Sequence, residues 1–117
     1  MVLYISFNSY ENYVINWIIS FLKQLLQNNN EKCAIIGTLG SGVPPKIKNT
    51  SLTTPNIINI YKSICEFQKK IIPNLAMEIS SHGLSQKRVY GLDFDTVIFT
   101  NLTKEHLDYH KNMKNYL

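Results

Sequence analysis

The sequence has little cysteine and no apolar run long enough to cross a membrane. Its 2 cysteines, Cys33 and Cys65, lie in apolar surroundings and form no CxxC or other ligand spacing, so we expect reduced, buried thiols. The apolar run YVINWIISFL is shorter than the roughly 20 residues that a spanning helix needs, and no basic segment or small-residue cleavage site marks it as a signal peptide. We therefore expect a cytoplasmic chain with no membrane partner.

The sequence also lacks a block of basic residues. The formal net charge is +4, but the lysines are spread along the chain without a basic and aromatic stripe. Because binding to nucleic acid needs clustered cations, we expect no nucleic-acid partner, whereas an acidic or phosphate-bearing small substrate fits the charge. The chain has 117 residues, of which 44% are hydrophobic and 17% charged, as expected of one globular domain or a piece of one.

Periodic apolar residues predict two amphipathic helices. One helix is expected from Val14 to the Asn28–Asn30 cluster, and another from Ile57 to Ile71, before Pro73. Three short apolar runs predict strands: Cys33–Gly37 and Asn74–Ile79, which are expected to be buried, and Thr96–Phe99. Between them, the Gly-, Pro-, Ser- and Thr-rich segment 38–55 predicts a loop, and a last helix is expected from near Thr103.

The alternation of these elements favours an α/β fold, a three-layer parallel sheet with helices on both faces. In such a sheet the carboxyl ends of the strands meet at one edge, where ligands bind. Residues at or just beyond the predicted strand ends are Gly37, Thr38, Glu78, Ser80, Thr100 and Asn101. We expect their side chains to converge on one crevice.

Glu78 interrupts the apolar strand Asn74–Ile79 near its end. A buried carboxylate is costly unless a cation, hydrogen-bond donors or water compensates it. A bound metal, a plain ion pair with a residue such as Arg88, and access to solvent all remain open from the sequence.

Other polar residues give weaker signals. His106 and His110 lie one helical turn apart at metal-ligand spacing, but the HExxH pattern of zinc hydrolases is absent because Leu107 follows His106. The loop GTLGSG, residues 37–42, lacks the lysine and hydroxyl of a phosphate loop. Two threonines, Thr53 and Thr54, can either cap the helix after Pro55 or offer hydroxyls to a ligand.

Four segments, in this order and spacing, resemble the central domain of the Mur ligases. They are IIGTLGSG, LTTP, AMEISSHGLSQKRV and FDTVIFTNLTKEHLDYHKNMKNYL, which together span residues 35 to 117. The resemblance implies a P-loop-like central domain that is incomplete here, with the N-terminal uridine-binding and C-terminal amino-acid-binding domains absent.

The resemblance implies an ATP-dependent ligase of peptidoglycan biosynthesis, which adds the third amino acid to UDP-N-acetylmuramoyl-L-alanyl-D-glutamate. ATP would activate the substrate carboxylate, and Mg²⁺ would neutralise the phosphate charge. By match of motif, Glu78 and His106 correspond to magnesium ligands. The residues that correspond to contacts with the UDP-muramoyl-dipeptide are Thr53, Thr54, Ser80, Gln86 and Arg88. No catalytic residue is assigned.

Two departures from the family pattern limit these expectations. Where the family has the phosphate loop GTNGKT, this chain reads SFNSYENY, with Glu11 about where the lysine would be. The family's carbamylated lysine, a magnesium ligand, would fall just beyond Leu117. We therefore expect a truncated ligase, weak or inactive alone; the alternatives are a non-catalytic remnant that binds a nucleotide sugar or a partner chain, and a zinc hydrolase that uses His106 and His110.

Overall fold

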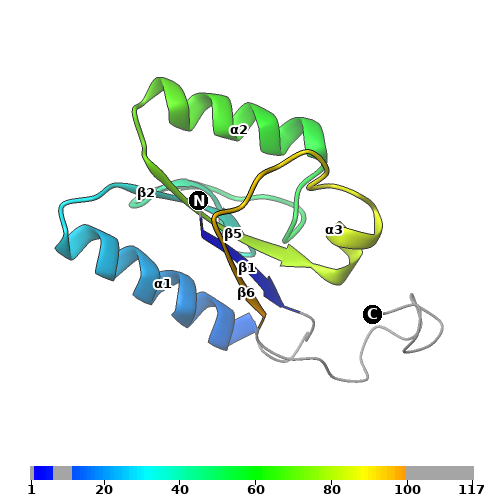
Figure 1. Ribbon diagram of the computed structural model, residues 1–117, viewed down its shortest axis with the longest axis horizontal. Helices are drawn as coiled ribbons and strands as arrows, with labels where there is room; N and C mark the ends of the chain where they lie inside the picture. The colour runs from blue at the N-terminus through cyan, green and yellow to red at the C-terminus, as the bar shows by residue number, and fades with distance from the viewer. Residues whose placement is uncertain (1, 7–11, 100–117) are drawn as a thin grey trace.

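The computed structural model describes residues 2–6 and 12–99, which form an α/β structure (Figure 1). Within these residues one sheet of six strands has the order β4-β3-β2-β5-β1-β6. The strands are β1 (Val2–Ser6), β2 (Cys33–Gly37), β3 (Gly40–Val43), β4 (Lys46–Lys48), β5 (Asn74–Ser80) and β6 (Thr96–Phe99). The helices are α1 (Asn12–Asn28), α2 (Ile57–Lys69) and the short α3 (Ser81–Ser85).

The expected parallel core is present, but the sheet as a whole is mixed. Strands β2, β5, β1 and β6 are parallel neighbours, so their carboxyl ends lie at one edge as predicted. β3 and β4 add an antiparallel hairpin next to β2, which corrects the prediction of an all-parallel sheet. The sequence pattern also predicts no strand before the first helix, whereas the structure has β1 there.

Helices α1 and α2 cover opposite faces of the sheet (Figure 1). Alternate residues of the strands divide between two hydrophobic clusters, because successive side chains of a strand point to opposite faces. Towards α2, Ile60 and Phe67 pack with a cluster formed by Ala34, Ile36, Leu75, Met77 and Ile79. Towards α1, Ile19 packs with Cys33, Ile35 and Ala76. Both predicted helices are therefore present, and α2 buries part of its apolar face. On α1 the buried residue is Ile19, whereas Trp17, Phe21 and Leu25 of the expected apolar face are exposed.

The segment predicted to be a loop, residues 38–55, contains the hairpin β3–β4. Its glycines were interpreted as loop signals, but they allow the two strands to approach closely. Gly40 has φ +117, and a Cβ atom there would overlap the carbonyl oxygen of Lys48; a Cβ atom on Gly42 would overlap that of Lys46. Glycine in this segment therefore serves strand pairing.

The expectation of two buried thiols holds only for Cys33. Both cysteines are free, but Cys65 lies on the exposed side of α2. Burial raises the pKa of the Cys33 thiol. No described helix is long and apolar enough to cross a membrane. The helix expected from near Thr103 lies outside the described residues.

Candidate functional site

Glu78 lies near the carboxyl end of β5, on the face of the sheet that α1 covers. Its side chain is only 2% exposed. Neighbouring β2 ends in Gly37, where a Cβ atom would lie 2.9 Å from Oε2 and 3.0 Å from Cβ of Glu78. The lack of a side chain at Gly37 therefore creates the space that the Glu78 carboxylate occupies.

The Glu78 carboxylate is held by hydrogen bonds from Thr38. The Thr38 backbone N–H donates to Oε2 of Glu78 at 2.8 Å. The hydroxyls of Thr38 and Thr53 are 3.0 Å apart and hydrogen-bonded. Burial raises the pKa of Glu78, and the hydrogen bonds from Thr38 lower it, with burial the larger effect. Glu78, Thr38 and Thr53 thus form a continuous oxygen-rich group.

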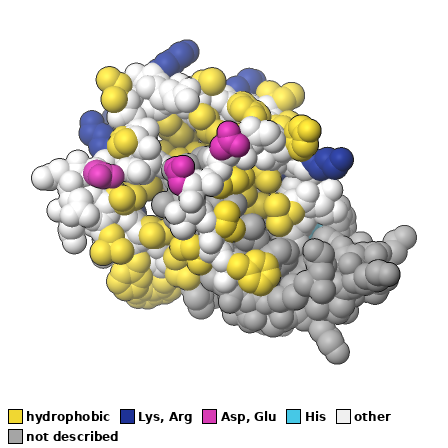
Figure 2. Space-filling model, in the orientation of Figure 1, with side chains coloured by type: hydrophobic (Ala, Val, Ile, Leu, Met, Phe, Trp, Pro, Cys, Tyr) yellow, Lys and Arg dark blue, Asp and Glu magenta, His cyan; other side chains and the backbone are white. Residues whose placement is uncertain are grey.

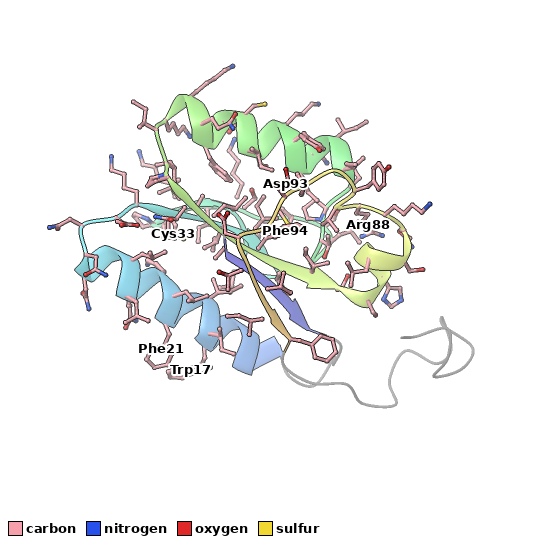
Figure 3. The ribbon with its side chains drawn as sticks, in the orientation of Figure 1. Trp17, Phe21, Cys33, Arg88, Asp93 and Phe94 are labelled. Atoms are coloured by element: carbon pink, nitrogen blue, oxygen red, sulfur yellow. The ribbon has the colours of Figure 1, made fainter. Side chains whose placement is uncertain are left out.

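The ion pair between Glu78 and Arg88 that the sequence left open does not form. Arg88 donates instead from Nη1 to the carbonyl oxygen of Thr54 at 2.6 Å and from Nε to Oε1 of Gln86 at 2.9 Å; its Nη2 also donates to that oxygen (Figure 3). Three of the five guanidinium N–H groups are used in this way within the described part of the chain. No other described residue is hydrogen-bonded to the remaining two.

Thr54 joins three segments that are distant in the sequence. Its side chain is fully buried; Oγ1 donates to the carbonyl oxygen of Glu78 at 3.2 Å and accepts from the Ser80 N–H at 2.9 Å. A Cβ atom on Gly83 would come within 2.8 Å of Thr54, so the glycine permits this contact. Thr54 therefore fixes the loop before α2 against β5 and α3.

Thr53 and Thr54 do not cap α2, a role that the sequence left open for them. Asn56 is the N-cap of α2, and its Oδ1 accepts from the Asn59 N–H at 2.9 Å. Ser80 is the N-cap of α3, since its hydroxyl accepts from the Gly83 N–H at 3.1 Å. The hydroxyls of Thr53 and Thr54 instead bond to Thr38 and to β5, as described above.

Six of the seven predicted site residues are brought together near the carboxyl end of β5. They are Thr53, Thr54, Glu78, Ser80, Gln86 and Arg88, linked by the hydrogen bonds described above. The seventh, His106, lies outside the described residues, as do His110, Thr100 and Asn101. The sequence placed Thr38 among the residues at the strand ends but assigned it no ligand. Its place directly after β2 was the available signal.

The described residues offer limited means of holding a metal. They contain no group of three or more His, Cys, Asp or Glu side chains that could bind one. Glu78, with the hydroxyls of Thr38 and Thr53, is an all-oxygen set, which suits a hard cation such as Mg²⁺ better than zinc. A magnesium ion commonly needs only one or two protein carboxylates, with water and substrate phosphates as its other ligands.

The comparisons with known proteins identify the family and support the fold. The family model described as "Mur ligase middle domain" matches residues 18–117. The chain is 45% identical over 96 residues to the UDP-N-acetylmuramoyl-L-alanyl-D-glutamate--2,6-diaminopimelate ligase of Coxiella burnetii. It is 42% identical over 99 residues to the ligase of the same name from Neisseria meningitidis serogroup A. These matches cover 82% and 85% of the chain but only 20% of each relative, so the chain spans about a fifth of their length.

A solved structure of a ligase of the same name has the same fold. It superposes with a TM-score of 0.79 at 25% identity and covers 98% of this chain and 22% of its own. The family model includes Glu78 and the strands from β2 to β6, and the structural match covers nearly the whole chain. This chain therefore belongs to the Mur ligase middle-domain family.

Proposed function

We propose that this chain forms the part of a peptidoglycan ligase that holds UDP-N-acetylmuramoyl-L-alanyl-D-glutamate. The observation that carries the proposal is the hydrogen-bonded group of Thr53, Thr54, Ser80, Gln86 and Arg88 at the carboxyl end of β5. The relatives are named as ligases of this compound with 2,6-diaminopimelate, so we propose diaminopimelate as the added amino acid and the cytoplasm as the site of action.

The chemistry of the group suits this substrate, which carries a diphosphate and carboxylates. The two remaining N–H groups of Arg88 can donate to an anionic oxygen, and charge-assisted bonds of this kind are stronger than neutral ones. Gln86 holds the guanidinium in place through Oε1, and the Thr54 carbonyl anchors its other end. Because these contacts already fix the Arg88 side chain, ligand binding would cost little side-chain conformational entropy.

We further propose that Glu78 holds Mg²⁺, with His106 as a second ligand. The support is chemical: a carboxylate that is 2% exposed has no cation beside it among the described residues, and two threonine hydroxyl groups are near. When bound, the ion would neutralise charge on phosphate oxygens. Glu78 itself would keep its charge more easily, since a nearby cation favours the ionised form.

The segment between β1 and α1 limits the activity that we propose for the chain alone. In the expected place of the phosphate loop, residues 6–13 read SFNSYENY and contain neither glycine nor lysine. Glycine lets backbone N–H groups approach phosphates closely, and lysine supplies positive charge. ATP, when bound, supplies the phosphoryl group that activates the substrate carboxylate. We therefore propose that substrate binding is retained and that ATP-dependent ligation by this chain is weak or absent.

A calorimetric titration of the purified chain with UDP-N-acetylmuramoyl-L-alanyl-D-glutamate tests the proposal. We expect binding that the substitution Arg88→Ala weakens about tenfold or more, since a hydrogen bond to a charged group contributes roughly 1.5–3 kcal/mol. Arg88→Lys should fall between the two, because lysine keeps the charge but loses the planar fork. Lys69→Ala, which removes an exposed cation from α2, is the matched control and should bind like the wild type.

Three outcomes separate the alternatives. Equal binding by Arg88→Ala and Lys69→Ala, with thermal melts that show both folded, would contradict the proposed role of Arg88. Binding without amino-acid attachment in the presence of ATP and Mg²⁺ supports the non-catalytic binding protein that the SFNSYENY segment favours. Robust ATP-dependent attachment of diaminopimelate would overturn the proposal of weak ligation.

A further inference from the structure

A groove of about 1000 Å³ runs between α2 and the hairpin β3–β4. It lies on the α2 face of the sheet, whereas the Glu78 carboxylate lies on the α1 face. Its apolar lining includes Val43, Pro44, Pro45, Leu52, Phe67 and Ile72. Five lysines also line it, namely Lys32, Lys46, Lys48, Lys62 and Lys70, all of them exposed. The groove therefore combines an apolar lining with a basic rim.

The strand register places two of these lysines on the groove side of β4. Lys46 is paired with Val43, which packs against the α2-side cluster, and Lys48 is paired with Ser41. Ser41 also faces α2, because its hydroxyl donates to that of Ser63 at 3.2 Å. Residues paired across an antiparallel ladder point to the same face of the sheet. Lys46 and Lys48 therefore stand on the face that α2 covers.

The opposite wall of the groove is one stripe of α2. The lining residues of the helix and its C-cap recur every three or four positions, the spacing of a single helical face: Asn59, Lys62, Ser63, Glu66, Phe67 and the C-cap Lys70. Lys62 and Lys70 on this wall thus face the same groove as Lys46 and Lys48. Glu66 is the single acidic residue among the described residues that line it, and no ion pair joins these lysines to another described residue. Because the like charges of these lysines repel one another, an anionic ligand in the groove would lower their electrostatic energy.

We propose that this groove binds an acidic, extended segment of a partner protein, in which carboxylates alternate with apolar side chains. β4 is the outermost strand of the described sheet, so no described strand closes the groove beyond it. The apolar side chains of such a segment would pack against the apolar lining, and its carboxylates would form ion pairs with the lysines. Stacking of nucleic-acid bases needs exposed aromatic rings, and Phe67, which lines the groove, is buried.

Fluorescence anisotropy with labelled synthetic peptides tests the proposal. The probe is a short peptide of alternating glutamate and valine, and its control replaces every valine by serine at the same charge. We expect the glutamate–valine peptide to bind more tightly than the control, and salt to weaken its binding because the charges are exposed. The double substitution Lys46→Glu and Lys48→Glu should weaken binding about tenfold or more, which equals roughly 1.4 kcal/mol or more.

The matched variant changes the same charge elsewhere. Lys23→Glu with Lys69→Glu alters lysines of α1 and α2 that do not line the groove, and it should bind the peptide like the wild type. Equal loss of binding in both double variants would show a general charge effect and overturn the site. Tighter binding of a single-stranded oligonucleotide or of tripolyphosphate than of the glutamate–valine peptide would overturn the class of ligand. Both variants change only exposed or half-buried side chains, and thermal melts check that they fold.

Discussion

At the scale of single residues, Glu78 keeps an ionisable group where water hardly reaches. Thr38 supplies hydrogen bonds, but no described cation compensates the charge. Because burial raises the pKa of Glu78, the folded chain retains a proton over a pH range in which the unfolded chain has released it. Stability therefore falls as the pH rises through this range, and it stays lower above it.

Replacing Glu78 by glutamine should stabilise the chain at neutral pH when Mg²⁺ is absent. The amide mimics the protonated acid and can still accept from the Thr38 N–H, so roughly 1 kcal/mol of desolvation cost is removed. Below the ordinary pKa of glutamate the two proteins should be equally stable. Urea unfolding at a series of pH values measures the difference. A gain of stability that did not change with pH would contradict the assigned titration.

At the scale of the element, the end of α2 has a well-defined cap with an unusual residue. The N–H of Ile72 donates to the Phe67 carbonyl at 3.0 Å and that of Ile71 to Gln68 at 2.9 Å, which is the Schellman pattern. Ile71 has φ +55, in the left-handed region that favours glycine, and its side chain is 85% exposed. This β-branched residue therefore adds strain without packing.

Replacing Ile71 by glycine should raise the free energy of unfolding by about 1 kcal/mol, because the left-handed conformation costs isoleucine roughly 1–2 kcal/mol. Asparagine, which tolerates this conformation, should give part of the gain, while valine should give none. Thermal unfolding of the three variants compares them directly. If Ile71→Val were as stabilising as Ile71→Gly, the strain would not explain the effect.

Helix α1 is apolar on more than the face that it buries. Ile19 is 2% exposed and packs on the sheet, but Trp17, Phe21 and Leu25 are 65%, 57% and 59% exposed. Trp17 and Phe21 project away from the sheet, with ring centroids 6.3 Å apart, and hydrophobic side chains gather over this helix (Figures 2 and 3). One periodic pattern thus contains both core and surface residues.

The two kinds of α1 residue should differ sharply in mutational cost. Ile19→Ala should lower the free energy of unfolding by roughly 2–4 kcal/mol, because it leaves a cavity. Phe21→Ala should change it by about 0.5 kcal/mol, since the side chain is 57% exposed and touches mainly the exposed Trp17. Urea unfolding followed by circular dichroism measures both. A cost for Phe21→Ala near that of Ile19→Ala would mean that the exposed stripe is packed in solution.

At the scale of the whole molecule, the strongly periodic elements were predictable and the hairpin was not. Local spacing predicted the helix α1 and the buried strand Cys33–Gly37, although it did not separate the buried Ile19 from the exposed Trp17 and Phe21. Strands β3 and β4 carry glycine and lysine where a strand usually carries apolar residues. Only the pairing of β3 with β2 through Gly40 and with β4 through Gly42, contacts between separate segments, makes them strands.

The candidate site shows the same division. The residue types around AMEISSHGLSQKRV identified Glu78, Ser80, Gln86 and Arg88 as candidates, and the strand ends predicted their convergence. The sequence could not show that Arg88 bonds to Thr54 and Gln86 and not to Glu78. Side-chain partners depend on distances between segments that are far apart in the chain, and no local pattern encodes them.

The sequence by itself determined the family, the main helices and strands, and the residues that carry polar chemistry, because each depends on residue type and local spacing. Only the tertiary structure decided which charges meet. Lysines that are spread along the chain line one groove beside α2, since the sheet register turns Lys46 and Lys48 to the same face. Likewise, Glu78 is buried because Gly37 of the neighbouring strand leaves room for it.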